Sequence, residues 1–285
     1  MTNKKIEKKF FTAQDIGSLR PNEKIALIAT LNEKDLPHIS FISSLLALDE
    51  THMAAGEFTR GISKKHIKTN HKIGFCILTL SLDMWRGKAE YTHSEKEGPV
   101  YSRFNEIPMF RYNTYFGINT VHFFDLVSTL GREKLPFLKI GMGMVSTMLT
   151  KWNFRGKHSV KPLNSLALNI INRIGSLKFL SWKGRDDFPV IFPVLQTWAS
   201  DPKTIVFSCS AFGEELKTLK PGIDVAVFAL TLKMENVLMR TVFKGFKRIC
   251  GINMGVCEIN WIYNSMPPIH GQVFPEIPVT EVTDF

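Results

Sequence analysis

"GISKKHIKTNHKIGFCILTL", residues 61–80, puts a short basic segment directly before a continuous apolar run. The first eight residues contain one serine and three lysines, Ser63, Lys64, Lys65 and Lys68. Residues 72–80 have the composition of a strand that is buried on both faces. A basic helix in this position is either solvated surface or a place where an anion is held, because free N–H groups and the helix dipole favour negative charge at a helix N-terminus.

Apolar runs on both sides of this segment predict further strands at short spacing. They cover residues 25–31, 38–48, 52–58, 72–80 and 84–92. Asn32, Asp35 and Pro37 supply turn chemistry after the first run. Five short strands with one inserted helix predict a small barrel rather than a βαβ sheet.

The second half of the chain repeats this order of elements roughly 150 residues downstream. Strand-like runs cover residues 176–182, 190–199, 203–209 and 223–232, with a short helical segment at 213–222. This spacing is too long for a solenoid and predicts a tandem duplication. Where the first copy has Lys64 and Lys65, the second has Glu214 and Glu215, which would repel a phosphate.

Two amphipathic stretches between the halves, residues 138–152 and 163–175, predict helices. The expected fold is therefore α+β and mainly antiparallel, with two tandem six-stranded split barrels joined by a helical connector. The predicted domains are an N-terminal barrel with an aromatic-rich insertion (1–132), the connector (133–175) and a degenerate second barrel with an extended tail (176–285).

The composition is that of a globular protein, with 44% hydrophobic and 22% charged residues. No apolar run reaches the roughly 18 residues of a membrane span, and the N-terminus lacks the apolar core of a signal peptide, so we expect a cytoplasmic protein without a membrane partner. The formal net charge is +10, but the lysines are spread along the chain, which makes nucleic acid an unlikely partner. The four cysteines have no C-x-x-C pair and predict reduced core thiols.

As a set, "NEKDLPHIS", "EFTRGISKKHIKTN", "KIGFCILTL" and "RGKAEY" resemble the flavin-binding split-barrel superfamily, the pyridoxamine 5'-phosphate oxidase-like proteins. The likeness covers about residues 20–130 well and 176–265 weakly. The chain departs from the family pattern at residues 34–36, where a glycine is usual before the proline. It departs again in the long insertion at residues 98–127.

This resemblance implies that the phosphate of flavin mononucleotide (FMN) is held at the start of the basic helix. The implied cofactor-binding residues are Ser43, Phe58, Thr59, Arg60, Ser63, Lys64, Lys65, Trp85 and Arg86. Arg60 has the fork geometry that binds two phosphate oxygens, whereas lysines supply point charges. Polar groups among aromatic residues in the insertion suggest a pocket wall or lid, and the candidates are Arg111, Tyr112, Asn113, Tyr115 and His122.

The expected function is FMN binding with flavin-dependent redox chemistry on a small-molecule substrate. A non-catalytic carrier of flavin, haem or deazaflavin (F420) is the alternative, and whether the protein is an enzyme stays open. The sequence identifies no catalytic residue, and the histidine spacing gives no support for a metal site. Split barrels normally pair, so both an internal pseudo-dimer and a homodimer are expected possibilities.

Overall fold

A computed structural model of the chain describes residues 6–20, 23–58, 61–110, 117–264 and 271–275. The described residues form two compact units. Unit 1 comprises those within Met1–Asp35, Ile39–Leu135 and Lys183–Ile191, and unit 2 comprises those within Leu36–His38, Pro136–Trp182 and Phe192–Phe285.

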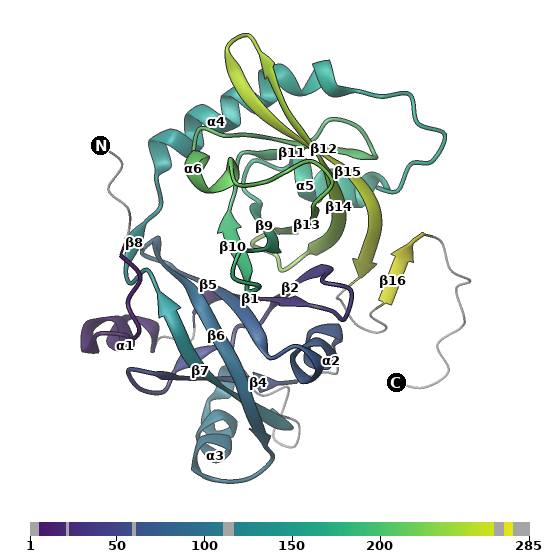
Figure 1. The fold of residues 1–285 in the computed structure, drawn as a ribbon. Coiled ribbons are helices and arrows are strands. Elements are labelled where there is room, and N and C mark those ends of the chain that lie inside the picture. The colour runs from purple at the N-terminus through teal and green to yellow at the C-terminus, as the bar shows by residue number, and fades with distance from the viewer. Residues whose placement is uncertain (1–5, 21–22, 59–60, 111–116, 265–270, 276–285) are drawn as a thin grey trace. The chain divides into compact units, whose positions relative to one another are not determined.

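The first half of the chain builds one antiparallel sheet with three helices and a 3-10 turn (Figure 1). The helical elements are α1 (Ala13–Leu19), α2 (Ile62–Thr69), α3 (Pro99–Glu106) and η1 (Pro108–Phe110). The strands are β1 (Lys24–Leu31), β2 (Pro37–Phe41), β3 (Leu46–Ala47), β4 (His52–Glu57), β5 (Lys72–Thr79), β6 (Asp83–Glu95), β7 (Thr120–Thr129) and β8 (Glu133–Lys134). Their order is β2-β1-β5-β6-β7-β4-β3, and β8 pairs with β6.

The second half builds another antiparallel sheet. Its helical elements are α4 (Phe137–Thr150), η2 (Lys151–Phe154), α5 (Ser165–Asn172) and α6 (Gly213–Leu216). The strands are β9 (Leu177–Lys183), β10 (Pro189–Pro193), β11 (Thr197–Ala199), β12 (Thr204–Ser208), β13 (Asp224–Leu230), β14 (Asn236–Ile249), β15 (Ile252–Asn264) and β16 (Gly271–Phe274). Their order is β10-β9-β13-β14-β15-β12-β11, and β16 pairs with β15.

The two sheets have the same strand order. Adding eight to each strand number in the first order gives the second order, and α2 and α6 occupy the same point in the chain order. The last strands differ, because β8 pairs with β6 whereas β16 pairs with β15. The prediction of two tandem, mainly antiparallel, barrel-like sheets is therefore confirmed. The predicted count of six strands was too low. Each sheet has eight in the described residues, because two strands of each are too short for a sequence period to reveal them: β3 and β8 in the first sheet, β11 and β16 in the second.

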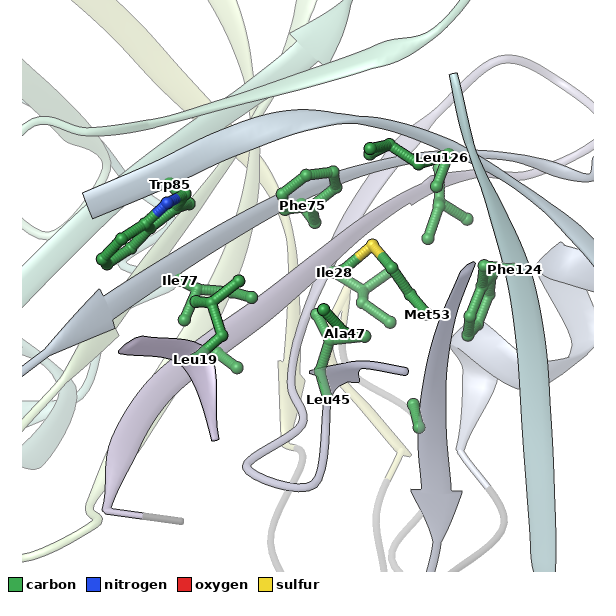
Figure 2. Packing of buried hydrophobic residues seen from close by; sticks show 14 of the residues in the cluster. Leu19, Ile28, Leu45, Ala47, Met53, Phe75, Ile77, Trp85, Phe124 and Leu126 are labelled. Atoms are coloured by element: carbon green, nitrogen blue, oxygen red, sulfur yellow. The ribbon is translucent and has the colours of Figure 1, made fainter. Parts of the chain in front are cut away.

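The core of the first sheet surrounds β5, the strand at the centre of the opening stretch. Its residues are buried from Ile73 to Leu78, as a fully apolar run predicts. Figure 2 shows this strand's Phe75 and Ile77 beside Trp85 of β6 and Leu19 of α1. The α1 helix is fixed by a capping box between Thr12 and Asp15, whose carboxylate also accepts a hydrogen bond from Trp85 Nε1 at 2.7 Å.

Both helices predicted between the halves are present, as α4 and α5, and both belong to unit 2. The inner face of α4 consists of Ile140, Gly143, Thr147 and Thr150, spaced three and four residues apart. This face packs on β11 and β12, and Thr147 Oγ1 donates a hydrogen bond to Gln196 O at 2.9 Å.

No disulfide joins the four cysteines. Cys76 and Cys257 are buried, and burial raises the pKa of each thiol to about 12, so both are inert core thiols. Cys250 departs from the expectation of core thiols because it is exposed, in a turn with φ of 47° between β14 and β15. Within the described ranges, no helix combines the length and apolarity needed to cross a membrane.

Candidate functional site

The candidate site lies at the N-terminus of α2. The helix begins after Gly61, which has no side chain to cap the first turn, and no acidic residue follows in that turn. A Cβ built on Gly61 would lie 3.6 Å from Lys64 Nζ, so this ammonium group turns back toward the helix N-terminus. Ser63 is buried, Lys64 is half-buried and Lys65 is exposed. The helix dipole and Lys64 therefore place positive potential at the same point.

A narrow pocket of about 10 Å³ opens beside this helix end. Its polar lining comes from Ser63, Lys64 and His122, and its apolar lining from Ile28, Ile42, Ala55, Gly56, Ile67 and Phe124. This volume suits a group the size of a water molecule and not an aromatic ring. The pocket can therefore receive one oxygen atom of an anionic group, while the rest of the ligand stays outside.

The strands β4 and β7 bring a buried acid–base pair to the pocket. His122 on β7 pairs with Ala55 on β4, two residues before Glu57. His122 Nε2 lies 2.8 Å from Glu57 Oε2, and both side chains are nearly inaccessible. Because a carboxylate only accepts, Nε2 carries the shared hydrogen. Nδ1 is buried and has no hydrogen-bond partner among the described residues, which is unusual for a polar atom at this depth.

The charges around Glu57 keep it ionised. Burial by itself raises the pKa of Glu57, but the hydrogen bond from His122 and the positive charges of Lys64 and Lys68 outweigh it, and the net pKa is lowered. Burial lowers the pKa of Lys64, an effect that Glu57 partly offsets. The charges of Lys64 and Lys68 minus the Glu57 carboxylate leave a net positive charge beside the helix N-terminus, which favours an anion there.

The backbone beside the pocket is held by Ser44. Its hydroxyl donates to Gly56 O at 2.8 Å and accepts from Gly56 N at 3.0 Å. Ser43, the serine predicted for the site, is its half-buried neighbour. A Cβ on Gly56 would collide with the Ile118 side chain, so glycine allows that side chain to pack against β4. Ser44 and Glu57 were missed by the sequence prediction.

Two predicted cofactor residues lie in the interior. Trp85 is fully buried and its indole nitrogen is bonded to Asp15, so the ring presents no surface to a flavin. Arg86 is also buried and binds Glu133 with two parallel hydrogen bonds of 2.9 and 3.0 Å. We therefore place neither residue in the candidate site.

Of the other residues predicted for the cofactor site or the lid, two lie in the described structure, and the rest lie outside the described residues. Phe58 packs edge-on against Phe110 at a centroid distance of 6.1 Å, next to α3. Among the lid candidates, His122 lies in the pocket itself. Thr59, Arg60, Arg111, Tyr112, Asn113 and Tyr115 lie outside the described residues.

The corresponding place in unit 2 is covered by α4. Gln196 takes the position of Ser44, and its amide donates to Ser208 O and Ala211 O just before α6. A Cβ on Gly143 of α4 would collide with Ser210 Oγ and lie 2.9 Å from Ser208 Oγ, so α4 lies directly against these two side chains. The α6 helix has four residues with Glu214 and Glu215 in its first turn. The packing of α4 and the negative charges of Glu214 and Glu215 both disfavour anion binding at the start of α6.

Because α4 packs against this part of unit 2, replacing glycine by alanine should have opposite effects on stability at two positions of α4. Gly141→Ala is expected to stabilise the protein by up to about 1 kcal/mol, because alanine favours the helix and nothing lies within 4 Å of the new Cβ. Gly143→Ala gains the same propensity but is expected to be destabilising by about 1–3 kcal/mol, because its Cβ forces α4 away from Ser210. Thermal unfolding of both variants measures the difference. Equal shifts for the two would contradict the close approach.

No cluster of histidine, cysteine or carboxylate side chains in the described part of the chain could hold a metal ion. No family model matches the sequence, and no curated protein matches it.

Several solved structures share part of the fold. An FMN-binding protein from Syntrophomonas wolfei subsp. wolfei is 18% identical, covering 41% of this chain and 84% of its own, with a TM-score of 0.34. A putative pyridoxamine 5'-phosphate oxidase from Lactobacillus delbrueckii is 17% identical, covering 43% and 94%, with a TM-score of 0.35. An F420 reductase is 12% identical, covering 39% and 90%, with a TM-score of 0.31.

Proposed function

We propose that the chain binds FMN, with the phosphate at the N-terminus of α2. The observation that carries the proposal is the convergence of three groups on one pocket: the N-terminus of α2, the Lys64 ammonium and the buried Ser63 hydroxyl. The sequence resemblance supports FMN as the cofactor, and the geometry supports the N-terminus of α2 as the place where its anionic end would be held.

The residues present fit a phosphate group. The backbone N–H groups of the first turn and Lys64 are donors suited to phosphate oxygens, and the buried Ser63 hydroxyl lines the same pocket. The carboxylate of Glu57 does not prevent binding, because Lys64 and Lys68 compensate its charge and it accepts a hydrogen bond from His122. The flavin ring system is too large for this pocket, so other parts of the chain must form the surface that binds the ring.

When bound, a flavin supplies hydride and electron transfer, and the protein supplies binding, orientation and electrostatics. We propose redox chemistry on a small molecule as the use of this cofactor. Oxidation of NADH or NADPH by the FMN-loaded protein would support an oxidoreductase, whereas flavin retention without turnover would favour a carrier.

The test is a comparison of FMN with riboflavin, which has the same ring but no phosphate. Each is titrated into the cofactor-free protein and followed by flavin fluorescence and absorbance. We expect FMN to bind about ten- to a hundred-fold more tightly than riboflavin, since charge-assisted hydrogen bonds to the phosphate are lost in the latter. Inorganic phosphate should compete with FMN. Equal affinity for both flavins contradicts the phosphate site, and a Soret band on haem addition without flavin binding favours the haem alternative.

A further inference from the structure

The outward face of α4 is apolar and exposed. Leu138, Met142, Val145, Leu149 and Trp152 recur at intervals of four and three residues, so they form one stripe along α4 and the following turn. This stripe lies opposite the buried inner face that packs on unit 2. Leu138 is 86% exposed and Leu149 is 71% exposed. A contiguous apolar stripe of this length marks an interaction surface rather than scattered surface residues.

The segment that contains this stripe is strongly basic. Between Glu133 and Asp186 the sequence has ten lysines and arginines and no acidic residue. The other 26 basic residues of the chain (36 minus 10) are balanced by its 26 acidic residues, so this segment accounts for the whole formal net charge of +10. Around the stripe, Lys139, Arg155 and Lys157 are exposed.

Trp152 joins the apolar stripe to the cationic groups. Its ring is exposed by about half, with Arg155 Cζ 3.7 Å from the ring centroid and Lys151 Nζ 5.0 Å from it. Tryptophan flanked by cations is suited to the boundary between an apolar phase and a charged one, because the ring prefers the interface and the cations reach anionic groups.

We propose that the apolar stripe of α4 docks on the surface of a bilayer that contains anionic lipids. The stripe would enter the boundary between headgroups and acyl chains, and the surrounding lysines and arginines would contact lipid phosphates. Charge complementarity selects this partner over a second copy of the chain. In a pairing of two identical stripes, each basic segment would face another segment that has no acidic residue to compensate it. The apolar runs of the sequence had predicted no membrane partner, because none is long enough to span a bilayer.

The test is sedimentation of the full chain with vesicles. The vesicles consist of phosphatidylcholine alone, or of phosphatidylcholine with roughly one third phosphatidylglycerol. We expect binding to the anionic vesicles, weakened by added salt, and little binding to phosphatidylcholine alone. The double variant Leu138→Gln and Leu149→Gln is expected to bind at least about ten-fold less, because two exposed leucines can no longer be buried in lipid.

The control is a second double variant, Leu80→Gln and Leu232→Gln. These leucines are 79% and 85% exposed but lie outside the basic segment, so vesicle binding should not change. Equal binding of the stripe variant and the unmodified protein would overturn the proposal, because binding would then be electrostatic alone. Absence of vesicle binding would also overturn it. The stripe would instead bind a second copy of the chain if two results were found together. The unmodified protein would form a dimer in sedimentation velocity that the stripe variant does not form, and neither protein would bind vesicles.

Discussion

Lys64→Gln is expected to weaken FMN binding by about ten- to a hundred-fold while leaving the protein folded. Lys64 Nζ is the ammonium group that turns back to the N-terminus of α2, where it lines the pocket with Ser63 and His122. Glutamine keeps the length of the side chain but removes the charge. Because burial already lowers the pKa of Lys64, losing this charge should cost little stability. Glu57 keeps the hydrogen bond from His122 and the positive charge of Lys68.

Two variants serve as controls for this experiment. Lys65→Gln removes the neighbouring charge at an exposed position, where solvent screens it, so a much smaller loss of FMN affinity is expected. Replacing Glu214 and Glu215 by alanine in α6 should leave FMN affinity and stoichiometry unchanged, because α4 covers that place in unit 2. Fluorescence titration with FMN measures all three. Undiminished affinity of the Lys64 variant would show that the α2 N-terminus does not hold the phosphate, and a large loss in the α6 variant would place the site in unit 2.

The architecture was predictable because it depends on local periodicity. The apolar run of residues 72–80 is long enough to identify β5, and its counterpart at 223–232 identifies β13 in the same manner. The common order of elements then indicates two related sheets. By contrast, β3 and β11 are too short for any period, so each was merged with the strand before it. The number of strands in each sheet was underestimated for this reason.

The site was only partly predictable because it depends on register between strands that are distant in sequence. Ser63 and Lys64 could be proposed from the helix alone. Glu57 and His122 meet only through the pairing of β4 with β7, and nothing in the sequence specifies that Ala55 lies opposite His122. His122 was proposed for a lid, whereas the structure places it in the pocket.

The surroundings of the β6 side chains could not be predicted from the sequence either. Trp85 and Arg86 are adjacent and point to opposite sides of the strand, yet both are buried. An arginine at a barrel edge suggests a ligand contact as readily as an internal ion pair. The choice between them depends on Glu133, which lies 47 residues away and reaches Arg86 because β8 pairs with β6.

Glu133→Gln is expected to destabilise the protein by about 3–5 kcal/mol, since it leaves the Arg86 guanidinium buried without its ionic partner. Both side chains are only 5% exposed and share two hydrogen bonds. The double variant Arg86→Met and Glu133→Leu should recover most of this loss, because neither position then carries a buried charge. Urea unfolding of the single and double variants gives the coupling between the two residues.

The matched control for this ion pair is Glu214→Gln, which removes an exposed carboxylate bonded to Lys217 and should change stability by less than about 1 kcal/mol. The Arg86 and Glu133 double variant should also retain FMN affinity, because the pair stabilises unit 1 from the interior and lines no part of the α2 pocket. A folded double variant that has lost FMN would return Arg86 to the cofactor site. A single variant as stable as the unmodified protein would show that Arg86 finds another partner or reaches solvent.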